Sequence, residues 1–381
     1  MKYKQMKNKI IHIIIITIFS FILIFPSIQG NFKLIKEPLL GGYVPEKKIP
    51  KLNSKTFFSE KYQKKAEQYA KYKYGYRAYF IRLYNQYKFS LYKKMNLREG
   101  LVYGKNGYLF GQYYIDSHFG KDFIGKDSIN KKIEKLKLIK DTLEKENKHI
   151  LTIIASSKGT FFEEYIPDKF KKNKTLSNYQ YYVKKFKEEN INFIDFNSYF
   201  LKIKGKKEYP LYPKYGVHWS IYGGTIVADS LISYIENQLK IDLPDVINEK
   251  FEIKKGSSRD IDTENSLNLF FKLDDVDYAY PTVQYDKKNK DTLTVLVVGD
   301  SFFYSINNQN LLSNEFYDSE FWYYNKGGTE RLPYNRKKDL IKLRTKMIKF
   351  NYIILISNEA KLHSFAWNFI EDLYNMYYSD Y

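Results

Sequence analysis

The chain of 381 residues contains no cysteine. Disulfide bonds and thiolate metal sites are therefore excluded, although the redox compartment stays open because exported proteins need not contain disulfides. Histidine and tryptophan are scarce, with five and three residues respectively, and no HExxH motif or other paired ligand spacing is present. We therefore expect neither a metal ion nor another cofactor.

Basic residues outnumber acidic ones, 63 to 43, which gives a formal net charge of +20. The excess is dispersed along the chain, with no arginine-rich stripe and no RNP, zinc-finger or helix-turn-helix signature. Lys, Ile, Asn, Tyr and Phe are all abundant, as an AT-rich coding bias would produce. We therefore expect no nucleic-acid partner. A preference for anionic glycans or lipid headgroups is the alternative meaning of the charge.

The first thirty residues predict attachment to a membrane. Residues 1–9 carry four lysines and no acidic residue, and residues 10–28 form an apolar run. About 20 residues span a bilayer core, and no small-x-small cleavage site follows this run. We expect a cytoplasmic tail over 1–9 and a transmembrane signal anchor over 10–29, with a cleaved signal peptide as the alternative. Either outcome places the remainder of the chain outside the cytoplasm.

Residues 30–95 are expected to form a stalk followed by a helical segment. Three prolines and a Gly-Gly pair between residues 30 and 55 predict an extended stalk. Beyond it, aromatic and aliphatic residues recur every three or four positions, which predicts one face of a helix. Gly75 is expected to interrupt that helix.

Residues 96–381 alternate between strand and helix patterns after a predicted hairpin around the turn GKNG at 104–107. The expected strands lie at residues 149–155, 191–196, 292–300, 320–327 and 350–357. The expected helices lie at residues 129–147, 176–189 and 223–239. This alternation predicts an α/β fold with a largely parallel sheet covered on both faces. Active residues in such folds collect at the carboxyl ends of the strands.

Polar residues follow three successive strands at those ends. The stretch TLTVLVVGDSFF ends a strand at Gly-Asp-Ser301, WYYNKGG ends the next at Gly327, and IILISNEA ends the third at Asn358. A serine at a strand end beside a helix start can be supported by N–H groups that stabilise an oxyanion. A helix-capping serine is the alternative for Ser301 taken alone.

This succession resembles the SGNH hydrolase superfamily, in which a GDS serine, an NxG glycine and a GxN asparagine occupy consecutive strand ends. The resemblance implies a flavodoxin-like parallel sheet, Ser301 as nucleophile, and Gly327 and Asn358 as members of the oxyanion hole. The third block departs from the pattern, since Ile356 stands in place of its glycine.

The histidine block, GVHW around His218, precedes the serine block instead of following it. That order resembles a narrower group, the alginate O-acetyltransferase domains of the AlgJ/AlgX type. GKNGYLF, SKGTFFEEYIP and NEAKLHSFAWNFI are also similar to blocks of that group. The resemblance implies an export-side, membrane-associated protein that moves acetyl groups onto a surface polysaccharide. A membrane-bound O-acyltransferase would be the donor. A carbohydrate acetyl esterase and a non-catalytic polysaccharide-binding module are the alternatives.

The usual aspartate two positions before the histidine is replaced by Gly216. Three readings follow. His218 and Ser301 act as a dyad with a backbone carbonyl behind the ring, or a carboxylate from another loop takes over, with Asp195 as the candidate. In the third reading the site has lost catalysis and only binds glycan. An acid is needed in a complete triad because it fixes the imidazole tautomer and stabilises the imidazolium.

Three further residues are candidates for contacts with the substrate. Lys158 follows a predicted strand, Trp219 adjoins the histidine and Arg331 lies in GGTERLPYN. A cation could contact an anionic sugar or acyl group, and an indole could stack on a sugar ring. Each has a plain structural alternative, namely a surface cation or a core tryptophan.

Overall fold

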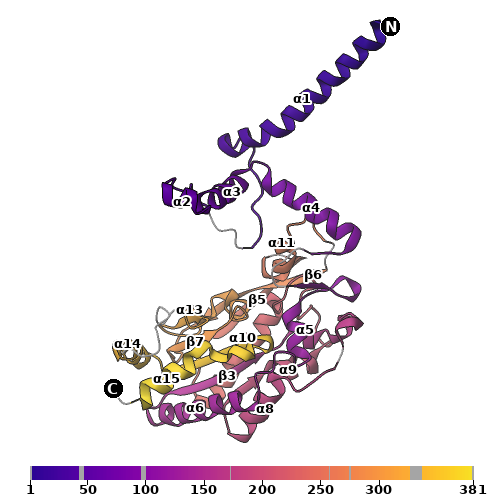
Figure 1. Ribbon diagram of the computed structural model, residues 1–381. Helices are drawn as coiled ribbons and strands as arrows, with labels where there is room; N and C mark the ends of the chain where they lie inside the picture. Colours follow the sequence, from indigo (N-terminus) through magenta and orange to yellow (C-terminus); the bar gives the residue numbers. More distant parts are fainter. Residues whose placement is uncertain are drawn as a thin grey trace. The chain divides into compact units, whose positions relative to one another are not determined.

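The computed structural model describes residues 2–42, 47–95, 100–171, 173–256, 258–273, 276–326 and 337–379. The chain divides into two compact units (Figure 1). The first comprises residues 1–97 together with 264–273, and the second comprises residues 98–263 together with 274–381.

The first unit is helical, with α1 (Lys2–Phe32), α2 (Ser54–Phe58), α3 (Lys61–Lys73) and α4 (Arg77–Tyr92). Residues Lys9–Phe32 are long and apolar enough to cross a membrane, with a mean hydropathy of 2.5. The predicted interruption at Gly75 is confirmed, because this residue separates α3 from α4. The N–H of Gly75 donates to the Pro26 carbonyl at 3.0 Å, and a Cβ there would lie 2.3 Å from that oxygen. The close approach of α1 therefore requires glycine at this position.

The second unit begins with the predicted hairpin. Strands β1 (Leu101–Tyr103) and β2 (Leu109–Gly111) pair in antiparallel fashion across the short helix η1 (Lys105–Gly107). Helix α5 (Gln112–His118) follows. The main sheet has five strands in the order β4-β3-β9-β7-β8, and its neighbouring strands pair in parallel. The strands are β3 (His149–Ala155), β4 (Phe193–Asp195), β7 (Val295–Gly299), β8 (Glu320–Tyr323) and β9 (Tyr352–Asn358).

Helices cover both faces of this sheet, as predicted for the α/β class. Successive residues of a strand point to opposite faces, and β7 and β9 therefore contribute to two separate hydrophobic clusters. One cluster includes α9 (Phe196–Ile203), α10 (Ile221–Leu239), α12 (Phe303–Ile306) and α13 (Leu311–Asn314). The other includes α6 (Lys126–Lys145), α8 (Asn178–Glu188), α14 (Lys337–Ile348) and α15 (Phe369–Tyr378).

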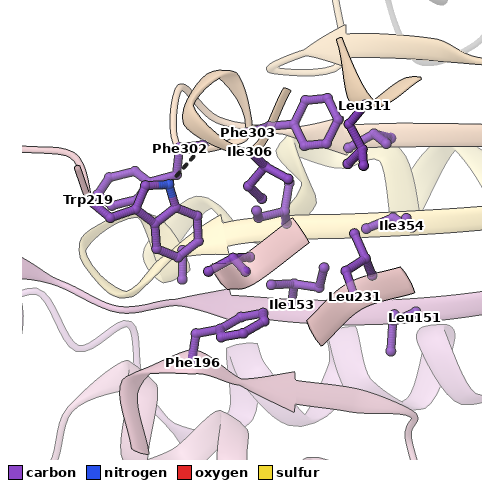
Figure 2. Packing of buried hydrophobic residues seen from close by; sticks show 14 of the residues in the cluster. Leu151, Ile153, Phe196, Trp219, Leu231, Phe302, Phe303, Ile306, Leu311 and Ile354 are labelled. Atoms are coloured by element: carbon purple, nitrogen blue, oxygen red, sulfur yellow. Dashed lines mark hydrogen bonds between the residues drawn. The ribbon is translucent and has the colours of Figure 1, made fainter. Parts of the chain in front are cut away.

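Figure 2 shows the first cluster from close by, with side chains of the strands packed against those of the helices and loops around them. Ile153 and Ile354 from the sheet lie near Leu231 of α10, and Trp219 lies beside Phe302. Both aromatic residues are almost fully buried. They adjoin His218 and Ser301 in the sequence, so the core reaches directly under the two candidate catalytic residues.

No helix or strand was predicted for the segment between α10 and β7. It forms an antiparallel ribbon of β5 (Asp245–Lys255) and β6 (Asp277–Asp286). Between these strands lie the 3-10 helix η4 (Ser258–Ile261) and α11 (Asp262–Leu267). The remaining short elements are α7 (Lys158–Phe161), η2 (Glu163–Tyr165), η3 (Asp168–Phe170), η5 (Asn307–Gln309) and η6 (Glu359–Asn368).

Candidate active site

Ser301 follows the carboxyl end of β7, where the sequence analysis expected it. The strand ends at Gly299, which pairs with Ile356 of β9. A Cβ on Gly299 would lie 2.2 Å from Cγ2 of Ile356. The isoleucine that departs from the superfamily pattern therefore occupies space that the glycine of GDS leaves open.

Asp300, the middle residue of GDS, ties the ends of β7 and β9 together. Its carboxylate accepts hydrogen bonds from the N–H of Phe302 at 3.0 Å and from the N–H of Asn358 at 2.7 Å. The side chain is buried, and burial raises its pKa against the opposing effect of these two N–H groups. Asp300 thus fixes the turn that presents Ser301 and takes no part as a solvent-exposed acid.

His218 lies next to Ser301 although 83 positions separate them in the sequence. Its Nε2 is 2.7 Å from the hydroxyl oxygen of Ser301. The ring is mostly shielded, with 13% of the side chain exposed. This distance and burial are those of a base that takes a proton from a serine hydroxyl.

A third residue completes the chain of hydrogen bonds. Nδ1 of His218 lies 2.5 Å from Oδ2 of Asp262, the first residue of α11. The other carboxylate oxygen accepts a hydrogen bond from the Val217 N–H at 3.1 Å. Because an ionised carboxylate can only accept, Nδ1 carries the hydrogen and Nε2 is free to accept the serine proton. Burial would raise the pKa of Asp262, but the His218 ring and the Val217 N–H stabilise its carboxylate and hold the pKa below the ordinary value.

Of the three hypotheses for the missing aspartate at position 216, the geometry matches the one in which a carboxylate from another segment contacts His218. That carboxylate is Asp262 and not Asp195. Asp195 caps α9 by accepting the Ser198 N–H at 3.1 Å, and it also accepts the Tyr179 hydroxyl at 2.8 Å. A backbone carbonyl behind the His218 ring, the other catalytic reading, does not occur, since Nδ1 faces the Asp262 carboxylate.

Sequence reasoning missed Asp262, and only a weak signal pointed to it. The stretch SSRDIDTEN contains three carboxylates, Asp260, Asp262 and Glu264, in a polar segment without a clear element pattern. Such a cluster is ordinarily a solvated surface segment, and no spacing rule links it to a histidine 44 positions earlier. Only the folded backbone brings the two together.

Lys158 and Trp219 lie in the core around the site. The Lys158 side chain is fully buried, and its ammonium group donates to the carbonyls of Lys214 and Gly216 at 2.8 and 2.7 Å. Trp219 is also fully buried, and its indole N–H donates to the Phe302 carbonyl at 3.1 Å (Figure 2). In these positions both side chains support the loops that carry the histidine and the serine. Neither side chain is exposed to solvent, so neither is placed to contact a substrate.

Asn358 lies at the end of β9, buried beside the end of β3. Its amide donates to the Ser156 carbonyl at 2.6 Å and makes a longer contact of 3.4 Å with the Ala155 carbonyl. The amide oxygen accepts the Ala360 N–H at 2.9 Å. The other two candidates, Gly327 and Arg331, lie outside the described residues.

Half-buried aromatic side chains surround the end of β7. The rings of Tyr323 and Tyr324 lie with centroids 4.1 Å apart, tilted by 30°, and Tyr324 contacts the ring of Trp367 at 4.9 Å. Tyr304, three positions after Ser301, lies 5.5 Å from the ring of Tyr323. The N–H of Tyr324 donates to the Gly299 carbonyl at 2.9 Å, which fixes this aromatic group to the strand that leads to the serine.

A family model described as "SGNH hydrolase-like domain, acetyltransferase AlgX" matches residues 101–316, more than half of the chain. The chain belongs to this family. The expected resemblance is thereby confirmed, as is the SGNH-type α/β fold. The matched range includes His218, Asp262 and Ser301, and it ends before Asn358.

Several solved structures are similar to this member of the AlgX family. The O-acetyltransferase domain of Pseudomonas putida AlgJ is 19% identical, with 73% of this chain and 99% of that chain covered and a TM-score of 0.48. Pseudomonas aeruginosa AlgX is 13% identical, with coverages of 71% and 67% and a TM-score of 0.46. Bacillus cereus PatB1 is 12% identical, with coverages of 71% and 99% and a TM-score of 0.45. No curated protein sequence matches the chain.

Proposed function

We propose that this protein transfers an acyl group, in the simplest case acetyl, to an exported or cell-surface polysaccharide through Ser301. The observation that carries the proposal is the hydrogen-bonded series Ser301–His218–Asp262, with contacts of 2.7 and 2.5 Å, on a domain of an acetyltransferase family. A serine, a histidine and a carboxylate hydrogen-bonded in this order form a catalytic triad whatever their order in the sequence.

The reaction would proceed in two steps. In the first, the Ser301 oxygen attacks the carbonyl carbon of the acetyl donor while Nε2 of His218 takes the hydroxyl proton. The carbon–oxygen bond to the donor breaks, and the departing alcohol receives that proton from His218. In the second step a sugar hydroxyl gives its proton to Nε2 of His218 and attacks the carbonyl carbon of the acetyl-serine. The bond from that carbon to the Ser301 oxygen breaks, and His218 returns the proton to the serine oxygen. Asp262 stabilises the imidazolium that forms in both steps.

An oxyanion forms at each tetrahedral intermediate and needs donors. We assign this role to the Ser301 N–H, to the Asn358 amide and to Gly327. The Asn358 amide donates to the Ser156 carbonyl at 2.6 Å and makes the longer contact of 3.4 Å with the Ala155 carbonyl. It would exchange that longer contact for a hydrogen bond to the oxyanion. Removing a single such donor in an enzyme costs about 10²- to 10³-fold in kcat.

A polysaccharide acceptor is supported by the aromatic side chains near the carboxyl ends of β7 and β8. Tyr304, Tyr323, Tyr324 and Trp367 are all half-buried, so each combines an anchored ring with some exposed surface. Sugar rings present apolar faces that can pack on such side chains. The donor would be a membrane-bound O-acyltransferase, and the apolar helix Lys9–Phe32 would hold the protein at the same membrane, on its outer side.

The test uses the full chain in a neutral detergent with a chromogenic acetyl ester. Wild-type protein should release the chromophore and carry an acetyl adduct on Ser301 that mass spectrometry detects, and Ser301→Ala should do neither. Addition of an acceptor polysaccharide should divert acetyl from water to the glycan if the protein is a transferase. Unchanged hydrolysis with no acetylated glycan indicates an esterase. Equal background release by wild type and Ser301→Ala would exclude both and favour a polysaccharide-binding module.

A further inference from the structure

A cavity of about 350 Å³ lies in the second unit between α10 and the ribbon of β5 and β6. The segment from α12 to Glu315 completes its wall. The hydrogen-bonded residues Ser301, His218 and Asp262 do not line this cavity. A volume near 300 Å³ is at the small end of the range for ligand sites. The cavity is therefore large enough for one compact ring.

Glu315, in the wall of this cavity, has a buried carboxylate oxygen, Oε2, without a hydrogen-bond partner among the described residues. The residue is 3% exposed. A buried polar atom without a partner is costly. A ligand that brings a donor into the cavity would remove that cost.

Further carboxylates line the same cavity. Asp229 and Glu236 project from α10, and Asp245 begins β5. Burial, strengthened by these three negative charges, raises the pKa of Glu315 to about 8, while the ammonium of Lys287 acts in the opposite direction. The other nearby lysine, Lys290, is already paired with Asp242 and Asp245 at 2.8 and 2.5 Å. The carboxylates in the cavity wall thus outnumber the lysines beside them, in a chain whose net charge is +20.

The remaining wall is apolar. Ile232, Ile306 and Leu311 contribute hydrocarbon surface, which favours a ligand with a carbon skeleton. Among the described residues, no group of three or more His, Asp or Glu side chains could hold a metal ion. A bare divalent cation therefore fits less well than an organic one.

We propose that this cavity binds the primary ammonium group of a compact organic cation, with Glu315 as the direct partner of the ammonium. Such a group supplies up to three hydrogen-bond donors and a positive charge, while the ring that carries it packs on the apolar wall. An amino sugar within a glycan and a free small amine share this chemistry. The proposal stands apart from acyl transfer, because it involves none of the residues assigned to that reaction.

The test is calorimetric titration of the full chain in neutral detergent at pH 7 with glucosamine, N-acetylglucosamine and cyclohexylamine. N-acetylglucosamine keeps the sugar ring and removes the positive charge. At least one of the two amines should bind, and N-acetylglucosamine should bind at least about tenfold more weakly. Tighter binding of glucosamine would identify a sugar source, and tighter binding of cyclohexylamine a free amine. Binding should also release protons, because an ammonium favours the ionised form of Glu315.

Two variants locate the site. Glu315→Gln keeps the shape and should weaken amine binding by about tenfold or more while chromogenic ester turnover is unchanged. Asp229→Asn changes an exposed residue, so it should fold normally and weaken binding by about threefold. Ser301→Ala should bind amines like the wild type, which separates this site from the proposed catalysis. The proposal is overturned if neither amine binds, if all three compounds bind equally, or if Asp229→Asn and a folded Glu315→Gln leave affinity unchanged.

Discussion

Gly216 lies directly against the backbone carbonyl of Arg259, so that a Cβ on Gly216 would be 2.7 Å from that oxygen. The carbonyl of Asp260 would lie 2.8 Å from the same Cβ. Both carbonyls belong to η4, which leads directly into Asp262. The segment that delivers the carboxylate to His218 thus occupies the space in which a side chain at position 216 would stand. An aspartate at 216 and this placement of Asp262 exclude each other, and the glycine is part of the site.

Replacement of Asp262 by asparagine should lower kcat for acetyl-ester hydrolysis by about 10³- to 10⁴-fold. The asparagine amide favours the wrong imidazole tautomer, since it can donate toward Nδ1 and leave Nε2 carrying the hydrogen. KM and the melting temperature should change little. Steady-state kinetics and thermal unfolding check the prediction.

The matched control is Asp195→Asn, because asparagine caps a helix about as well as aspartate does. This variant of the other candidate acid should keep kcat within about twofold of the wild type, since Asp195 caps α9 and accepts the Tyr179 hydroxyl, and His218 faces Asp262 instead. A large loss of kcat in Asp195→Asn, with none in Asp262→Asn, would refute the assignment of the acid.

Gly216→Ala should be destabilising by about 1–3 kcal/mol, because the two carbonyls that face the new methyl group are backbone atoms with little freedom to retreat. The expected consequence is a lower melting temperature together with a lower kcat, since η4 would move and carry Asp262 away from His218. Gly216→Asp combined with Asp262→Asn should remain inactive. Recovery of wild-type turnover by that double variant would show that the two positions are interchangeable, contrary to the packing described above.

The strands that could be predicted from the sequence are those whose burial requires a run of apolar residues. Strands β7 and β9 are buried on both faces, and they appear in the sequence as uninterrupted apolar runs. The ribbon of β5 and β6 has no such apolar run. In the described part of the chain its two strands pair only with each other, and Phe251 and Ile253 are 41% and 48% exposed, so no uninterrupted apolar run identifies it in the sequence.

The candidate site divides in the same way. Ser301 and His218 stand in short blocks with a recognisable order, and so could be identified from the sequence. The role of Lys158 could not, because a lysine after a strand is ordinarily exposed and its burial depends on the rings of Tyr108 and Phe110, which lie 5.7 and 5.5 Å from its ammonium group. Asp262 depends on how η4 packs, which no local pattern encodes.

Lys158→Met should lower stability and turnover together. Methionine fills similar space but leaves the carbonyls of Lys214 and Gly216 without the ammonium donor, which costs about 1–3 kcal/mol for each buried group left unsatisfied. These carbonyls belong to the loop that leads into His218, so kcat should fall as the loop loses its fixed position. Thermal unfolding and ester kinetics measure the two effects.

Lys105→Met is the control for that variant, since Lys105 forms an ion pair with Asp168 in which both side chains are well exposed. Exposed pairs contribute about 0–1 kcal/mol, and kcat should be unchanged. If both lysine variants behave alike, Lys158 has no special role in holding the histidine loop.

The last prediction concerns Glu359, which follows Asn358 and is buried. Burial raises its pKa to about 7, although the Thr160 hydroxyl and the Asn197 amide donate to Oε2 at 2.6 and 2.8 Å. A carboxyl whose pKa is higher in the folded chain than in the unfolded chain binds more protons when folded. Its contribution to stability is therefore complete below about pH 4.5 and is lost as the pH rises through about 7.

Glu359→Gln keeps an oxygen that can accept both hydrogen bonds but cannot titrate. The difference in melting temperature between this variant and the wild type should move in favour of the variant as the pH rises from 4.5 to 7.5. A Glu359→Gln variant whose melting temperature runs parallel to that of the wild type across this interval would contradict a titrating carboxyl beside Asn358.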